Sequence, residues 1–161
     1  MSEITAWTQW SDLKAPPGIN LRSPKDFPLE SSDLSQINFY VPSYMGGKDA
    51  LDWAAKMPNL KVLQMPNAGY DDALAYLKPG LILCNAQGVH DASTAELAVA
   101  LALSARRGIP DFVRDQGNEN WNHHRRTSLA DSKVGVIGFG SIGKQVAKNL
   151  SGFEVEVIGF S

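Results

Sequence analysis

The sequence predicts an α/β protein built on parallel sheets. Strand-like and helix-like segments alternate along the first ninety residues, which is typical of βαβ units. A glycine-rich turn joins a strand-like segment to a helix-like one near residue 140. Apolar residues make up 43% of the 161 residues and charged residues 20%, so the chain can bury a core and does not have the composition of a disordered protein.

The first ninety residues contain short runs of alternating kind. Apolar or β-branched runs that stop at a proline or a turn predict strands, and apolar residues at helical spacing predict helices. The predicted strands are Ile4–Thr8, Asn38–Val41, Leu60–Met65 and Leu81–Cys84. The predicted helices are Asp49–Met57 and Asp71–Leu77, the latter with Asp71 as N-cap. Four prolines make residues 15–35 rich in loops, and we assign them no structure.

Residues Ser93 to Gly108 carry the clearest helix signals. Ser93 and Glu96 have the spacing of a capping box, and Gly108 is a typical stop. The run LAVALALSA between them is apolar on every face, so we expect a long helix that is buried all round. Pro110 can open a second helix, Asp111–Gln116, and the polar residues 118–131 indicate a connector.

Composition and charge exclude several classes of protein. Fifteen basic and 17 acidic residues give a net charge of −2, so we expect no nucleic-acid partner. A single cysteine, Cys84, argues against a disulfide scaffold and favours a reducing compartment. The N-terminus has neither the basic start nor the apolar run of a signal peptide, and Leu97–Ala105 is far shorter than the ~20 residues of a membrane span. We expect a cytoplasmic protein with no membrane partner.

The pattern that carries chemistry is G-x-G-x-x-G, over Gly138–Gly143. The motif alone is weak evidence because glycine is common, so its context decides. Val134–Ile137 predicts a strand directly before it, Lys144–Leu150 a helix after it, and Val155–Phe160 a second strand. Together they form one complete βαβ unit, which is the context that dinucleotide binding requires.

Each glycine of the motif has its own expected role. Gly138 permits a tight turn, Gly140 lets the backbone approach a pyrophosphate, and Gly143 lets the helix pack closely on the strand. The start of the helix then offers the free N–H groups of Ser141 and Ile142 to the phosphates. We therefore predict that these five residues bind a dinucleotide; the alternative is a glycine turn that binds nothing.

The residue at the end of the second strand bears on the choice of cofactor. An NAD-binding unit has an acidic residue ~20 positions after the motif, which holds the ribose 2′-hydroxyl. Here the corresponding position is Ser161, which carries no charge and does not repel a 2′-phosphate. We expect NAD or NADP, with NADP slightly favoured. The alternative is that the discriminating residue follows Ser161.

Three blocks of sequence together resemble the D-isomer-specific 2-hydroxyacid dehydrogenases, a family that includes glyoxylate/hydroxypyruvate reductases. In order they are NAGYD (Asn67–Asp71), STAELAVALALSARR (Ser93–Arg107) and VGVIGFGSIGKQVAKNL (Val134–Leu150). The resemblance covers roughly residues 55–161 and implies a flavodoxin-like N-terminal segment, the long helix, and the first βαβ unit of a truncated Rossmann domain. It divides the chain into part of a substrate domain (1–91), connecting helices and linker (92–131), and part of an NAD(P)-binding domain (132–161).

The resemblance also implies roles for residues outside the glycine motif. It places the N–H groups of Ala68 and Gly69 against the carboxylate of a small 2-oxo or 2-hydroxy acid, where the alternative is a simple turn. It places Thr94 against the cofactor, although Thr94 also lies inside the expected capping box. Tyr44 and Met45 are candidates to line the substrate pocket. The family's dimers imply a homodimer built around the dinucleotide domain and the long helix.

The resemblance implies hydride transfer between a nicotinamide and the substrate's 2-carbon. The family's catalytic arginine, glutamate and histidine lie after the second strand of its dinucleotide domain, so we assign no catalytic residue here and no metal ligand; His123 and His124 fit a solvated connector. Two hypotheses remain. The chain is the N-terminal part of such a dehydrogenase, or a catalytically inert truncated relative that dimerises or binds nucleotides. In both cases we expect no turnover by this chain alone and weak dinucleotide binding at best.

Overall fold

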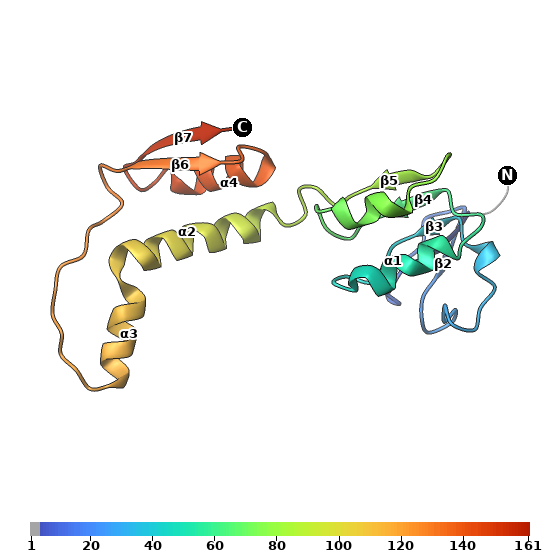
Figure 1. The fold of residues 1–161 in the computed structure, drawn as a ribbon, viewed down its shortest axis with the longest axis horizontal. Coiled ribbons are helices and arrows are strands. Elements are labelled where there is room, and N and C mark those ends of the chain that lie inside the picture. The colour runs from blue at the N-terminus through green and yellow to red at the C-terminus, as the bar shows by residue number, and fades with distance from the viewer. Residues whose placement is uncertain (1–3) are drawn as a thin grey trace. The chain divides into compact units, whose positions relative to one another are not determined.

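The structure is a computed structural model that describes residues 4–161. The chain divides into two compact units, one ending at Gln87 and the other spanning Gly88–Ser161. Each unit has its own parallel sheet (Figure 1), so the predicted α/β fold is confirmed. None of the helices in the described part of the chain is both long enough and apolar enough to span a bilayer.

The first unit is built on a five-stranded sheet in the order β2-β1-β3-β4-β5, with every neighbouring pair parallel. This is the strand order of flavodoxin-like folds. Four of its strands confirm the predicted ones with shorter bounds, and β2 falls in the region to which the sequence assigned no structure. The strands are β1 (Ile4–Trp7), β2 (Ile19–Arg22), β3 (Phe39–Tyr40), β4 (Val62–Gln64) and β5 (Ile82–Cys84).

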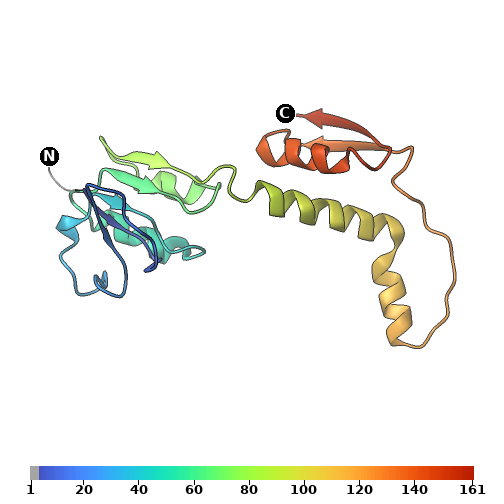
Figure 2. The same ribbon diagram turned by 180° about the vertical axis from the view of Figure 1, so that it is seen from behind.

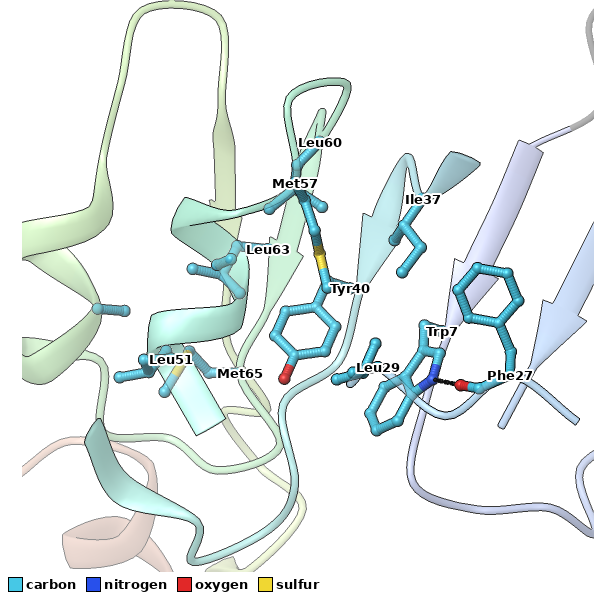
Figure 3. Close-up of a cluster of buried hydrophobic side chains, with 12 residues drawn as sticks. Trp7, Phe27, Leu29, Ile37, Tyr40, Leu51, Met57, Leu60, Leu63 and Met65 are labelled. Atoms are coloured by element: carbon cyan, nitrogen blue, oxygen red, sulfur yellow. Dashed lines mark hydrogen bonds between the residues drawn. The ribbon is translucent and has the colours of Figure 1, made fainter. Parts of the chain in front are cut away.

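The core of the first unit lies between this sheet and the helices and loops that pack against it. Figure 3 shows Tyr40, Ile37, Met57 and Leu63 gathered together, and all four are completely buried. The polar atoms of the core aromatic rings are satisfied. Trp7 Nε1 donates to the Phe27 carbonyl oxygen at 2.9 Å, and the Tyr40 hydroxyl donates to the carbonyl of Ala50 in helix α1 (Gly47–Ala55) at 2.7 Å.

Two short 3-10 helices complete the part of this unit that the structure describes. In η1 (Leu34–Gln36), Asp33 accepts from the Ser35 amide at 3.1 Å as an N-cap. The predicted helix at Asp71–Leu77 is η2 (Asp71–Tyr76), also a 3-10 helix, and its N-cap is Tyr70 without a side-chain bond. The expectation that Asp71 caps it was wrong, because Asp71 is already the first helical residue.

The second unit contains the predicted βαβ segment. Strands β6 (Lys133–Ile137) and β7 (Glu156–Phe160) pair in parallel, and α4 (Ser141–Leu150) connects them. Helix α2 (Asp91–Arg107) packs against α4, as both views show (Figures 1 and 2), and α3 (Ile109–Gly117) follows it. Residues 118–131 form no helix or strand, which confirms the predicted connector.

Helix α2 corrects two expectations. It begins at Asp91, two residues before Ser93, and Ser93 Oγ donates back to the His90 carbonyl at 3.2 Å, so the capping box of Ser93 and Glu96 is not formed. The helix is also not buried all round. Its buried residues are Ala95 and Val99, because only one of its faces packs on the rest of the unit, whereas Leu97 and Leu101 are 59% and 60% exposed.

The end of α2 follows the sequence signals closely. Gly108 has φ +66°, the left-handed conformation that commonly ends a helix. Pro110 then lies in the first turn of α3, where its missing N–H costs no helical bond. The predicted stop and restart are therefore confirmed, and they explain why α2 and α3 are separate helices.

Candidate functional site

The glycine motif forms the turn between β6 and α4. Gly138 follows the last residue of β6 and has φ +85°, a conformation in which an L side chain is strained. Gly140 is the N-cap of α4, which begins at Ser141. The turn is therefore the strand–turn–helix connection that the sequence predicts, with the glycine at the position that needs its backbone freedom.

The other two glycines differ in what surrounds them. A Cβ on Gly143 would collide with the carbonyl oxygen of Gly138 and lie 3.3 Å from Val136 Cγ1, so the helix approaches the strand too closely for any side chain. A Cβ on Gly140 would meet nothing within 4 Å. Gly143 is thus required by packing within the protein, whereas the space in front of Gly140 is open.

The backbone amides around the turn fall into two groups. Those of Gly138 and Phe139 both donate to the carbonyl of Phe160, at 2.8 and 2.9 Å, which ties the turn to the end of β7. Those of Ser141 and Ile142 lie in the first turn of α4, where a helix has no acceptor of its own to offer. Together with the positive end of the helix dipole, these amides can hold an anion.

Two further predicted cofactor residues, Thr94 and Ser161, lie in the second unit. Ser161 is exposed and comes directly after Phe160, whose carbonyl is bonded to the turn. Thr94 is exposed on the first turn of α2, and its amide donates to the His90 carbonyl at 3.0 Å, so only its side chain is available to a ligand.

The sequence reasoning missed Asp91, which lies at this site. Ser141 Oγ, at the start of α4, donates to the Asp91 carboxylate at 3.2 Å. Both side chains are half-buried. The two residues lie fifty positions apart, and no local pattern connects them. Only the packing of α2 against α4 brings a negative charge to the first turn of α4.

The predicted carboxylate-binding residues lie in the first unit. Ala68 and Gly69 are in the turn that follows β4, at the carboxyl edge of the sheet. The carbonyl of Ala68 accepts from Asn85 Nδ2 at 2.8 Å, and the carbonyl of Asn67 accepts from the Ala86 amide at 2.9 Å. The segment after β5 therefore holds this turn by its carbonyl groups, and Gly69 itself is exposed.

A hollow of about 210 Å³ opens beside this turn, at the carboxyl ends of β3 and β4. Met45, Met65, Pro66 and Asn67 contribute to its lining. Met45 has φ +60° and is 83% exposed, so its side chain projects from the loop. Of the two predicted pocket residues, Met45 thus lines a hollow, and Tyr44 is an exposed ring on the same loop.

The histidines of the connector pack on aromatic rings. His123 stacks on Trp121 with ring centroids 6.3 Å apart, and His124 stacks on Phe112 at 5.0 Å. Across residues 4–161, His, Cys, Asp and Glu side chains do not gather in threes or more in a way that could hold a metal ion.

Comparison with known proteins shows which family the region of the glycine turn is similar to. Residues 99–161 match the profile described as "D-isomer specific 2-hydroxyacid dehydrogenase, NAD binding domain". Over these residues the chain is similar to the D-isomer specific 2-hydroxyacid dehydrogenases. The match covers the second half of α2 and all of α3, β6, α4 and β7, so it includes the whole glycine motif.

Two curated relatives extend the similarity to these dehydrogenases beyond the profile. A D-3-phosphoglycerate dehydrogenase of Methanocaldococcus jannaschii is 34% identical over 119 residues, which cover 71% of this chain and 23% of that protein. A glyoxylate reductase of Thermococcus litoralis is 29% identical over 164 aligned positions, which cover 94% of this chain and 46% of that protein. The chain therefore spans half or less of the length of these relatives.

Solved structures of 2-hydroxyacid dehydrogenases share the fold. The NADPH-dependent glyoxylate/hydroxypyruvate reductase of Sinorhizobium meliloti, solved with NADP and sulfate, matches with a TM-score of 0.76 and 24% identity. The match covers 98% of this chain and 52% of that one. At this identity the likeness establishes the fold of the chain.

Proposed function

We propose that this chain carries the cofactor-binding turn and the substrate-carboxylate turn of an NAD(P)-dependent oxidoreductase that interconverts small 2-oxo and 2-hydroxy acids. The observation that carries the proposal is the glycine turn between β6 and α4, closely packed at Gly143 and open at Gly140. The matched NAD-binding profile and the names of the relatives support the same activity.

In this proposal the diphosphate of the cofactor lies against the open side of the turn. The amides of Ser141 and Ile142 donate to it, and Gly140 leaves room for it. Thr94 and Ser161 flank the cofactor. The absence of a carboxylate at Ser161 slightly favours NADP over NAD.

The substrate's carboxylate is proposed to bind the N–H groups of Ala68 and Gly69. Two neighbouring amides at the carboxyl edge of a parallel sheet suit a small anion, and the adjacent hollow lined by Met45 suits its carbon end. The bound nicotinamide would supply or accept the hydride. The proposal assigns binding and orientation to this chain's residues and assigns no proton transfer to any of them.

Replacing Gly140 tests the proposal directly. Gly140→Val places a side chain in space that is empty in the protein, so it should fold normally but block the diphosphate. We expect the wild type to bind NADPH or NADH more weakly than micromolar in calorimetry, and Gly140→Val to show no binding. Gly152→Val is the matched control, because Gly152 follows the other end of α4 and also has nothing within 4 Å of its Cβ position. Equal binding by wild type and Gly140→Val would show that the dinucleotide does not bind at the glycine turn.

A second function is favoured by the exposed leucines of α2. Leu97 and Leu101 form an apolar face that the rest of the second unit leaves open, and a second copy of the chain would cover it. We propose that the chain is a cytoplasmic homodimer, and under this alternative it is an inert dimerising or nucleotide-binding module. Turnover of glyoxylate or hydroxypyruvate with NADPH or NADH separates the two: we expect none from these 161 residues alone, and measurable turnover would show that catalytic residues lie among them.

A further inference from the structure

Two helices of the second unit begin side by side. Figures 1 and 2 both show α2 and α4 starting at the same end of the unit and running in the same direction. The hydrogen bond between Asp91, the first residue of α2, and Ser141, the first residue of α4, confirms that the two starts are adjacent. Two helix N-termini therefore present their positive ends to the same region.

A carboxylate already lies at this position. Asp91 accepts from Ser141 Oγ at 3.2 Å, so its negative charge is held at the first turn of α4. The same first turn carries the amides of Ser141 and Ile142 that the proposed function gives to the diphosphate. A half-buried charge at this place is screened less by solvent than an exposed one.

We propose that Asp91 is an internal anion that competes with the dinucleotide for the start of α4. In the free protein its carboxylate compensates the converging positive ends of α2 and α4. When a diphosphate arrives, the same carboxylate repels it. Asp91 is thus a specificity-determining residue that weakens the binding of anionic ligands at the glycine turn. This inference rests on the proposed function for the location of the diphosphate.

The substitution Asp91→Asn separates charge from shape. Asparagine has nearly the same size and keeps an oxygen that can accept from Ser141, but it carries no charge. We expect Asp91→Asn to tighten the binding of NADPH and NADH by about three- to ten-fold at low salt. The gain should be similar for both cofactors because they share the diphosphate, and it should shrink at high salt.

The experiment uses calorimetry on the full chain, with Glu96→Gln as control. Glu96 is an exposed carboxylate on the same helix, and its removal changes the net charge by the same amount. Circular dichroism verifies that both variants fold. In parallel, inorganic pyrophosphate is titrated while the amide resonances of Ser141 and Ile142 are followed by nuclear magnetic resonance, with half-saturation expected at a lower concentration in Asp91→Asn than in the wild type.

Each outcome decides the inference. Tighter dinucleotide binding by Asp91→Asn, with Glu96→Gln unchanged, supports both the inference and the proposed function. Equal binding by Asp91→Asn and wild type overturns the inference and leaves the function standing, and equal gains from both variants overturn it too, because net charge then explains them. If no dinucleotide binds but pyrophosphate saturates Asp91→Asn first, the inference stands and the proposed function fails. If neither ligand binds either protein, both fail.

Discussion

Tyr40 shows how one buried side chain makes the stability of the first unit depend on pH. Its ring is fully buried, and its hydroxyl donates to the Ala50 carbonyl at 2.7 Å. Burial raises the pKa of Tyr40 far above its ordinary value of 10.0, because the phenolate would have to be desolvated. The unfolded chain releases this proton more easily than the folded protein does. The contribution of Tyr40 is therefore complete below about pH 10 and is lost as the pH rises above that value.

This predicts a pH-dependent effect of Tyr40→Phe. At neutral pH the variant should lower the free energy of unfolding by about 0.5–1.5 kcal/mol, the usual value of one hydrogen bond. From about pH 10 to pH 11 the difference should shrink, because only the wild type loses stability through this group. Urea unfolding of the wild type and the variant at several pH values measures this difference in the free energy of unfolding. Tyr70→Phe, on an exposed ring, is the control and should follow the wild type. A difference that stays constant across this range would contradict the expected role of burial.

Residues differ in how far the sequence could reveal their roles. The turn at Gly138 and the close packing at Gly143 were predictable, because both follow from neighbours within one motif. Asp91 was not, since its contact with Ser141 depends on two helices fifty residues apart. A local pattern predicts what a residue does for its own turn, but not which charge a distant helix brings to it.

At the scale of elements, α2 shows where helical patterns mislead. Ser93 and Glu96 satisfy the capping pattern, yet the helix begins at Asp91. The boundary of a helix can shift by one or two residues without any change in the sequence pattern. The all-apolar run of α2 correctly predicts a long helix. It does not predict which faces of α2 are buried, because that depends on which other elements of the second unit pack against the helix.

Arg106 connects α2 to the connector and predicts a local effect. Its Nε donates to the Ser128 carbonyl at 3.1 Å, and its Nη2 donates to Ser132 Oγ at 3.2 Å. We expect Arg106→Ala to speed hydrogen exchange at the amides of Asp131 and Ser132 by up to about tenfold. The free energy of unfolding should change by less than about 1 kcal/mol, since the bonds are exposed.

The neighbouring arginine provides the control for this prediction. Arg107 is also exposed and lies in the same last turn of α2, but among residues 4–161 its side chain makes no hydrogen bond or ion pair. Arg107→Ala should leave the exchange of the connector as in the wild type. Equal exchange in both variants would show that the connector is held by other contacts.

At the scale of the whole molecule, the two units differ in how much core they build. The first gathers a continuous cluster of buried side chains around Tyr40 and Leu63. The second leaves Leu97, Leu101 and Ile137 largely exposed. Leu97 and Leu101 are neighbours one turn apart on α2, and exposed apolar residues that lie together commonly mark an interface. This difference supports the proposal that the second unit associates with another copy of the chain.

The proposed dimer predicts that Leu101→Glu yields a monomer. A charge in the centre of the exposed face of α2 should be costly in an interface and harmless in a monomer, because the side chain is 60% exposed. Light scattering on wild type and variant at equal concentration measures the mass. Lys144→Glu, a change of similar size on the exposed surface of α4, should remain a dimer. If the wild type is already monomeric in light scattering, the proposed homodimer is wrong.

The sequence predicted the architecture better than its details. Alternating segments and the βαβ context of the glycine motif predict parallel sheets, and all five strand pairings within residues 4–161 are parallel. Strand β2 escaped prediction because Ile19–Arg22 is only four residues long and is surrounded by prolines. Its pairing with β1 is a tertiary contact that no local propensity encodes.

The bond between the Phe160 carbonyl and the glycine turn has a practical consequence for protein production. Ser161 directly follows Phe160, so any residues attached after Ser161 begin next to that turn. A C-terminal affinity tag would begin beside the turn at which we propose that the cofactor binds, and a polyhistidine tag would bring its own charge there. The tag therefore belongs at the N-terminus, and affinities from C-terminally tagged material would describe the tag as much as the protein.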